Sequence, residues 1–378
     1  MDPDATVSFR RDYGLAQADV AAGVVSSRAA AAVGHWETWC TFCTGLGVDP
    51  TLQEYEDPIP FLQVFVYRYR NGIIAPSRKG VRSRTVEDAL RSVGQTFASV
   101  GTQDPRLNTL GKIDFRIQRQ LACYTRQDPP PNRVKPVPVP ILMHIVSTAL
   151  TGGNIFQIAT ADMIALAFFY LLRPGEYTGT RTESTPFRLC DVQLFQGSAR
   201  LNLPTASDAA LLSATFASLT FTTQKNGVKG EVIGLGHSGN PEFSPTVCLA
   251  RRIIHLRQHN SLTNTPLASV WDTRRGCFKP IKASDITSSL KLACTLLGPH
   301  FGFLPSDISA RSLRASGAMA LLCAQVDSDI IRLLGRWRSD EMLRYLHCVA
   351  APVMRDFSSR MIQHGSFTIH PNQSVPVW

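Results

Sequence analysis

Residues 309–347 read SARSLRASGAMALLCAQVDSDIIRLLGRWRSDEMLRYLH, and the rest of the chain can be interpreted around this stretch. An apolar segment with helical spacing begins at Arg311 and Arg314, which lie three residues apart and therefore share one helix face. The positive end of a helix dipole repels cationic side chains and attracts anions, so this placement favours an anion site over stability. Tyr345 follows among further cations, which raises the question of whether these basic groups act on it.

Arg173 is a second basic residue in an unusual setting. It ends an almost wholly apolar helical segment, residues 161–172, and is followed by Pro174 and Glu176. Burying an arginine is costly, so this side chain must face a pocket or an acidic partner. A structural ion pair between Arg173 and Glu176 is the simpler interpretation of the same residues.

Lys225 is a third, at the predicted tip of a β-hairpin. The segment 219–232 is rich in Thr, Phe and Val, and Asn226-Gly227 is a strong hairpin signal between two strands. The alternation in 201–204 predicts one more strand, which would complete a small sheet. A solvated lysine at the turn would explain Lys225 equally well.

The segment 128–140, DPPPNRVKPVPVP, is the clearest domain boundary, because six prolines cannot continue a helix or lie inside a sheet. The patterns on its two sides predict an α+β, mainly helical chain. The first domain is expected to be all-helical, and the second to be mixed with a small antiparallel sheet. The expected parts are a tail 1–20, a helical domain 21–127, the linker 128–140, a mixed domain 141–365 and a tail 366–378.

Apolar spacing of about 3.6 residues and capping signals predict the helices of both domains. In the first domain they begin at Ser26 or Ser27, span 59–69, begin near Ser83 or Thr85, and span 114–125. In the second they are 141–150, 161–172, 248–259, a helix with Ser284 as its N-cap, and the block from Arg311 onward.

Composition favours a polyanionic partner. The chain has 378 residues, a net charge of +10 and 44% apolar residues, so it can bury a sizeable core, and nucleic acid is the commonest partner of such a basic protein. A basic enzyme without such a partner fits the charge too. Nine cysteines, a start without an apolar signal sequence, and a longest apolar run far below the ~18–20 residues that span a bilayer predict a soluble, intracellular, thiol-reduced protein with no membrane contact.

The order Arg, Lys, R-x-x-R, G-R-W and Tyr resembles the tyrosine recombinases, the phage-integrase-like family, and is most similar to recombinases of eukaryotic mobile elements. The motifs cover 166–347 and the architecture the whole chain. The resemblance implies a helical DNA-binding domain and a catalytic domain that cuts and rejoins duplex DNA through a 3′-phosphotyrosyl intermediate. It also implies double-stranded DNA and a homo-oligomer, from dimer to tetramer, as partners, and the nucleus of a eukaryote or otherwise the cytoplasm or nucleoid as location.

The resemblance assigns roles position by position. Tyr345 matches the nucleophile, Arg173 and Arg314 the two catalytic arginines, Lys225 the hairpin lysine, and Glu176 the acidic residue that supports Arg173. Two positions depart from the family: Arg311 stands where histidine is usual, and the place nine residues before the tyrosine, usually histidine or tryptophan, falls on Arg336 with Trp337 beside it. Because arginine stands at 311, the acid–base assistance that the histidine usually gives is in question. At the position nine residues before the tyrosine, either Arg336 or Trp337 could take the usual role.

The chemistry fits these residue types. Arginine forks can neutralise the nonbridging oxygens of a phosphodiester bidentately, cations favour the phenolate of a tyrosine, and a mobile lysine can protonate the leaving 5′ oxygen. Because the arginines supply the positive charge, no metal or other cofactor is expected. The candidate phosphate contacts outside the site are the basic residues of a loop and of the linker: Arg78, Lys79, Arg82, Arg84, Arg133 and Lys135.

Several alternatives remain open. A catalytically inactive DNA-binding protein derived from such a recombinase would keep the arginines, and a strand-relaxing topoisomerase would use the same chemistry. Cys40 and Cys43 are interpreted as core cysteines rather than a metal or redox site, and His255 and His259 as surface residues. A C-terminal helix over 354–364 could dock on a neighbouring subunit or cover its own domain.

Overall fold

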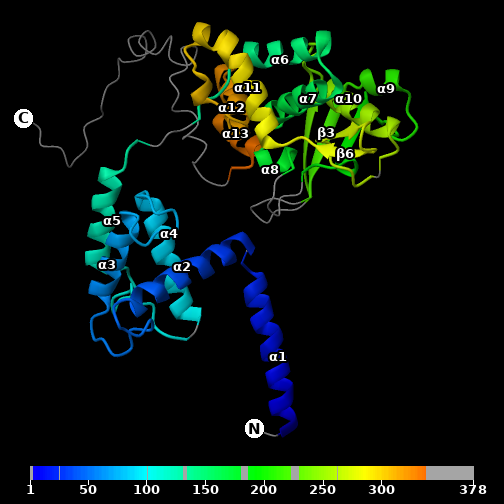
Figure 1. Cartoon of the computed structure of the whole chain (residues 1–378). Helices are drawn as coiled ribbons and strands as arrows, with labels where there is room; N and C mark the ends of the chain where they lie inside the picture. The colour runs from blue at the N-terminus through cyan, green and yellow to red at the C-terminus, as the bar shows by residue number, and fades with distance from the viewer. Residues whose placement is uncertain are drawn as a thin grey trace, which may run out of the picture. The chain divides into compact units, whose positions relative to one another are not determined.

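The computed structural model describes residues 3–24, 26–99, 101–130, 134–179, 186–222, 230–261 and 263–337. The chain divides into two compact units, Met1–Pro131 and Asn132–Trp378. The predicted fold class, mainly helical with a small antiparallel sheet, is confirmed (Figure 1). None of the helices in the described ranges is long and apolar enough to cross a bilayer.

The first unit is built from α1 (Pro3–Ala22), α2 (Ser26–Thr44), α3 (Ile59–Arg70), α4 (Ser83–Ser99) and α5 (Phe115–Gln127). Helices α2 to α5 enclose an aromatic core in which Trp39, Phe65 and Phe97 are fully or almost fully buried. Asp128 accepts hydrogen bonds from the backbone N–H and the hydroxyl of Ser83, so it caps α4 from outside the helix. Helices α2 and α4 begin at Ser26 and Ser83, each of which is one of the two residues predicted for that start.

The expectation of a tail over residues 1–20 is wrong, because residues 3–22 form helix α1. Pro3 occupies the first helical turn, where proline is tolerated, and five alanines with no further proline favour helix along the segment. Polarity alone suggested an irregular tail. Helical propensity is the better guide here.

Cys43 lies fully buried in the core of the first unit, as predicted. Burial raises the pKa of its thiol to about 12, so the group is a neutral apolar side chain at physiological pH. Cys40 is partly buried on the same helix, and burial raises its pKa as well.

The second unit contains α6 (Val139–Gly152), α7 (Ile155–Phe169), α8 (Pro174–Tyr177), α9 (Asp208–Leu212), α10 (Pro245–Gln258), α11 (Ala283–Leu297), α12 (Ser312–Cys323) and α13 (Ser328–Gly335). Three short 3-10 helices are η1 (Leu189–Asp191), η2 (Gly298–Phe301) and η3 (Pro305–Asp307). Helix α7 is central: every residue from 159 to 168 is buried, and the helix contacts α6, α10, α11 and α12. The C-terminal end of α7 is therefore fixed from several sides.

The sheet of the second unit has the strand order β2-β1-β3-β4, with β1 (Val192–Gln196), β2 (Ala199–Arg200), β3 (Phe216–Phe221) and β4 (Glu231–Gly236), all antiparallel. The predicted hairpin is the β3–β4 pair, in which Phe221 is opposite Glu231. Its turn, with Lys225, lies outside the described residues. A second hairpin, β5 (Ser269–Asp272) with β6 (Cys277–Pro280), was not predicted.

Two local expectations in this unit, a strand and a helix cap, are corrected. The additional strand is not 201–204 but β1 with β2, because only Leu201 continues the pairing, donating to Leu194, before the chain turns away. Ser284 is not the N-cap of α11; Lys282 is, and Asp285 accepts from its backbone N–H at 2.8 Å.

His255 is also a correction, because it is buried rather than on the surface. Its Nε2 accepts a hydrogen bond from the backbone N–H of Trp271 on β5 at 3.1 Å, and His259 stacks on the Trp271 ring. Burial lowers the pKa of His255 to about 4, with Arg252 and His259 acting in the same direction. The neutral ring therefore attaches β5 to α10.

We expect acid to destabilise the protein through His255. The unfolded state, with a pKa near 6.5, binds more protons than the folded state between pH 6.5 and about 4, so up to about 3 kcal/mol of stability is lost as pH falls through that window. Urea unfolding of His255→Gln between pH 4 and 7 should show a flatter dependence than the native chain. The exposed His300→Gln is the control, and equal slopes in all three proteins would contradict the assignment.

Gly317 on α12 marks the close approach of α12 to the end of α7. A Cβ at this position would lie 2.2 Å from the Phe168 carbonyl oxygen and 2.3 Å from a methyl group of Leu171. A backbone oxygen cannot move aside as a flexible side chain can. The glycine is therefore required for α12 to reach α7.

Gly317→Ala is expected to lower the free energy of unfolding by about 1–3 kcal/mol through overpacking. Gly152→Ala, at the end of α6 with no atom within 4 Å of the added Cβ, is the matched control. It should be neutral or stabilise by about 0.5 kcal/mol. Denaturant unfolding followed by circular dichroism measures both, and equal stability of the two variants would refute the close approach.

Candidate active site

The site begins at the end of α7, where the chain turns through a left-handed leucine. Leu171 has φ = +50°, and the N–H groups of Leu171 and Leu172 donate to Phe168 and Ala167, closing the helix as a Schellman motif. Glycine usually occupies such a position because a side chain is strained there. The turn points the Leu171 carbonyl away from the helix.

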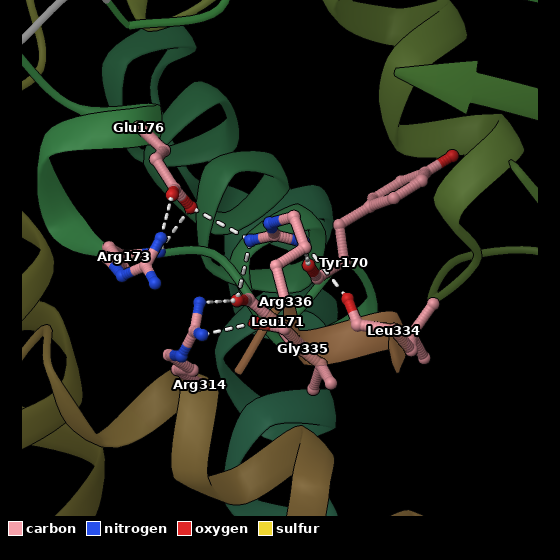
Figure 2. Close-up of polar contacts among 8 residues, drawn as sticks. All are labelled: Tyr170, Leu171, Arg173, Glu176, Arg314, Leu334, Gly335 and Arg336. Atoms are coloured by element: carbon pink, nitrogen blue, oxygen red, sulfur yellow. Dashed lines mark hydrogen bonds and ion pairs between the residues drawn. The ribbon is translucent and has the colours of Figure 1, made fainter. Parts of the chain in front are cut away.

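The Leu171 carbonyl accepts from two arginines of different helices. Arg314 Nη1 donates to it at 2.8 Å and Arg336 Nη2 at 3.3 Å, as Figure 2 shows. Both arginines lie more than 140 residues along the chain from Leu171. One carbonyl thus joins α12 and the end of α13 to the end of α7.

Glu176 on α8 joins two arginines with its two carboxylate oxygens. One oxygen lies 2.7 Å from Arg173 Nη1; the other accepts from the Arg173 backbone N–H at 2.8 Å and from Arg336 Nη2 at 3.0 Å. The Glu176 side chain is 11% exposed and that of Arg173 28%. Glu176 therefore orients Arg173 while leaving part of its guanidinium open to solvent.

Arg314 is 4% exposed, and it donates through Nη2 to the Gly335 carbonyl as well as to Leu171. Its guanidinium lies over the Trp337 ring, 4.2 Å from the ring centroid. This is the range of a cation–π contact, which orients the plane of the fork.

Arg336 is as deeply buried as Arg314, and it also pairs with the Glu176 carboxylate. Besides Glu176 and Leu171, it donates to the carbonyls of Tyr170 and Leu334, and it lies 3.9 Å from the Phe221 ring centroid at the end of β3. Burial lowers its pKa, while Glu176 opposes that effect. Its contacts connect α7, α8, α13 and β3.

The structure thus brings together five of the residues singled out in the sequence: Arg173, Glu176, Arg314, Arg336 and Trp337. Arg311 is exposed at the N-cap of α12. Tyr345 and Lys225 lie outside the described residues. The assembled groups form a cationic cluster held by one carboxylate and several backbone carbonyls, an arrangement suited to binding a phosphate through arginine forks.

The candidate phosphate contacts outside the site divide into two groups. Arg78, Lys79 and Arg82 are exposed on the loop between α3 and α4. Arg84 pairs with Glu87 and Asp88 on the surface of α4, and Lys135 pairs with Asp307 at 2.9 Å. Arg133 lies outside the described residues.

Two features of the site were missed in the sequence. The Leu171 carbonyl is a shared acceptor because of the left-handed backbone conformation there, and a leucine in the sequence does not predict that conformation. The contact of Phe221 with Arg336 depends on the packing of β3. The small residues of the ASGA run around Gly317 were the one available signal for the close approach of α12.

A scan against protein-family models found no match, and no curated protein matches the sequence. Among solved structures, the chain is similar to the Tn1549 transposon integrase in complex with transposon right end DNA, with 14% identity, a TM-score of 0.44, and coverage of 82% of this chain and 85% of that one. It is also similar to XerA recombinase (12% identity, TM-score 0.35, 89% and 100% covered) and to a lambda integrase dimer bound to a core site (13%, 0.38, 75% and 78%). At these values the likeness assigns neither a family nor an activity.

Glu176→Gln should lower the free energy of unfolding by about 3 kcal/mol, because it removes the charge that compensates two arginines, one of them buried. The exposed Glu242→Gln in the same unit is the matched control and should change stability by less than about 0.5 kcal/mol. Urea titrations of both variants provide the measurement. If the two changes are equally mild, Glu176 does not hold the cluster together.

Proposed function

We propose that this chain is a tyrosine recombinase that cuts and rejoins duplex DNA. The observation that carries the proposal is the meeting of Arg173, Glu176 and Arg314, from α8 and α12, at the end of one buried helix. Their order along the chain and their types match the sequence pattern that resembles this family. The net charge of +10 supports a polyanionic substrate.

In the proposed reaction, Tyr345 attacks the scissile phosphate. The phenolate oxygen forms a bond to phosphorus, the bond to the 5′ oxygen breaks, and a 3′-phosphotyrosyl link and a free 5′-hydroxyl result. A second strand's 5′-hydroxyl then reverses the step, so the energy of the phosphodiester is kept without ATP. Arg173 and Arg314 neutralise the nonbridging oxygens, and Lys225 protonates the leaving oxygen.

The proposal extends to partners and setting. The substrate is double-stranded DNA, contacted also by the exposed Arg78, Lys79 and Arg82, and the active form is a homo-oligomer of two to four chains on DNA. The nucleus is the proposed location if the source is a eukaryote, where the encoding gene would belong to a mobile element.

A second candidate function is a DNA-binding protein that has lost catalysis. It is favoured by Arg311, which lacks the acid–base capacity of the histidine usual at that position. Such a protein would bind duplex DNA with a steep salt dependence, since each phosphate contact releases counterions, and it would form no covalent adduct.

The deciding experiment uses duplexes selected from a random library by the purified protein, nicked close to the cleavage position so that the released fragment diffuses away. The native chain should accumulate a protein–DNA adduct that survives denaturing electrophoresis, and Tyr345→Phe should accumulate at least about 100-fold less, because the nucleophile is absent. Tyr177→Phe, a buried tyrosine that donates to the Ala310 carbonyl, is the control and should retain the adduct.

If native protein and Tyr345→Phe form equal amounts of adduct, Tyr345 is not the nucleophile. If neither forms one while both bind the duplex, the second candidate function holds.

A further inference from the structure

Arg336 is enclosed as completely as Arg314, at 5% and 4% exposed, and far more than Arg173, whose side chain is 28% exposed. Its guanidinium is moreover paired with the Glu176 carboxylate, at 3.0 Å. Its two terminal nitrogens donate to Glu176 and to the carbonyls of Tyr170, Leu171 and Leu334, while Phe221 covers one face of the guanidinium. A phosphate oxygen could reach this fork only by displacing groups that hold Arg173 and Arg314.

The backbone at Arg336 has an unusual conformation for an arginine. It lies in the left-handed region at φ = +57°, and the N–H groups of Arg336 and Trp337 donate to Leu333 and Arg332 to close α13. A glycine would adopt this conformation without strain. The turn directs the Gly335 carbonyl to Arg314, Trp337 beneath Arg314, and Arg336 toward Glu176.

We propose that Arg336 is a positioning residue. It orients Arg173 and Arg314, the two arginines proposed to bind the phosphate, and does not itself touch the phosphate. Through Glu176 it fixes the carboxylate that orients Arg173. Through the Leu171 carbonyl it fixes the acceptor that orients Arg314. This inference rests on the proposed function, since it assigns Arg336 a part in the same reaction.

The geometry needs a planar fork rather than a positive charge alone. Arginine presents five donors in a fixed plane, which suits acceptors on four residues and a stacked aromatic ring. A lysine would keep the charge but could not span Glu176 and the Leu171 carbonyl in the same way.

The test compares two nicked duplexes that differ only at the scissile phosphate, which is either the natural diester or a methylphosphonate. The methylphosphonate lacks one charged nonbridging oxygen, so an arginine that touches the phosphate becomes less necessary. The variants are Arg173→Ala, Arg336→Met and, as the matched control on the same helix, Arg332→Met, whose arginine is 43% exposed and pairs with Asp329. The readout is the rate of covalent adduct formation.

We expect Arg173→Ala to lose about 100-fold on the diester and to recover at least about tenfold on the methylphosphonate, because it loses a direct phosphate contact. Arg336→Met should lose activity by the same factor on both duplexes, and Arg336→Lys should restore little of it. Arg332→Met should behave as the native chain. Combining Arg336→Met with Glu176→Gln should cost less than the product of the two single losses, because both break one unit.

Recovery of Arg336→Met on the methylphosphonate to the same extent as Arg173→Ala would overturn the inference, as would activity equal to that of Arg332→Met. If Arg336→Met does not fold, Glu176→Gln carries the same comparison, with an equal loss on both duplexes expected and methylphosphonate rescue contradicting it. A native chain that cleaves neither duplex would instead refute the proposed function, and the inference with it.

Discussion

The candidate site depends on the ion pairs that the Glu176 carboxylate makes with Arg173 and Arg336. This carboxylate is a single negative charge, nearly buried, between two arginines. A cluster of guanidinium groups repels itself, and this charge offsets both that repulsion and the cost of burying Arg336. Because Arg336 shares the Leu171 carbonyl with Arg314, the same carboxylate also acts on the third arginine.

Helix α7 supplies the rigid support that this arrangement needs. It is buried from residue 159 to residue 168, and neighbouring helices pack against it, so the core holds its carbonyl-bearing end in place. The arginines of α12 and α13 are oriented by acceptors whose positions are fixed by the core rather than by the surface. Preorganisation of this kind is what electrostatic stabilisation of a phosphoryl transition state requires.

Local signals in the sequence accounted for much of the fold. Apolar spacing and capping residues located α3, α4 and α5, and Asn226-Gly227 located the β3–β4 pair. Features that depend on distant partners could not be predicted from local signals. His255 is buried because β5 packs on α10. The hairpin of β5 and β6 was missed because SVWD and CFKP are short and lack a strong alternation. Helix α1 was missed because polarity was weighed above propensity.

The site shows the same division. Arg173 with Glu176 could be expected from adjacency in the sequence, whereas Arg336 and Trp337 could not be told apart, because they are neighbours in one motif. The left-handed turn at Arg336 separates them, sending one side chain to Glu176 and the other to Arg314. That turn is a property of the folded backbone, and the presence of an arginine at position 336 does not predict it.

The long sequence separation between Leu171 and its two arginine partners has a consequence for how the molecule forms. Helix α7 and its neighbours α6 and α10 can pack before the chain beyond residue 258 is present, but the bonds from Arg314 and Arg336 close loops of more than 140 residues. Such contacts follow the local ones, because loop closure costs entropy that only a formed partner surface repays. We therefore expect the cationic cluster to be completed late, so that a still growing chain carries part of the hydrophobic core of the second unit without the arginines that would hold a phosphate.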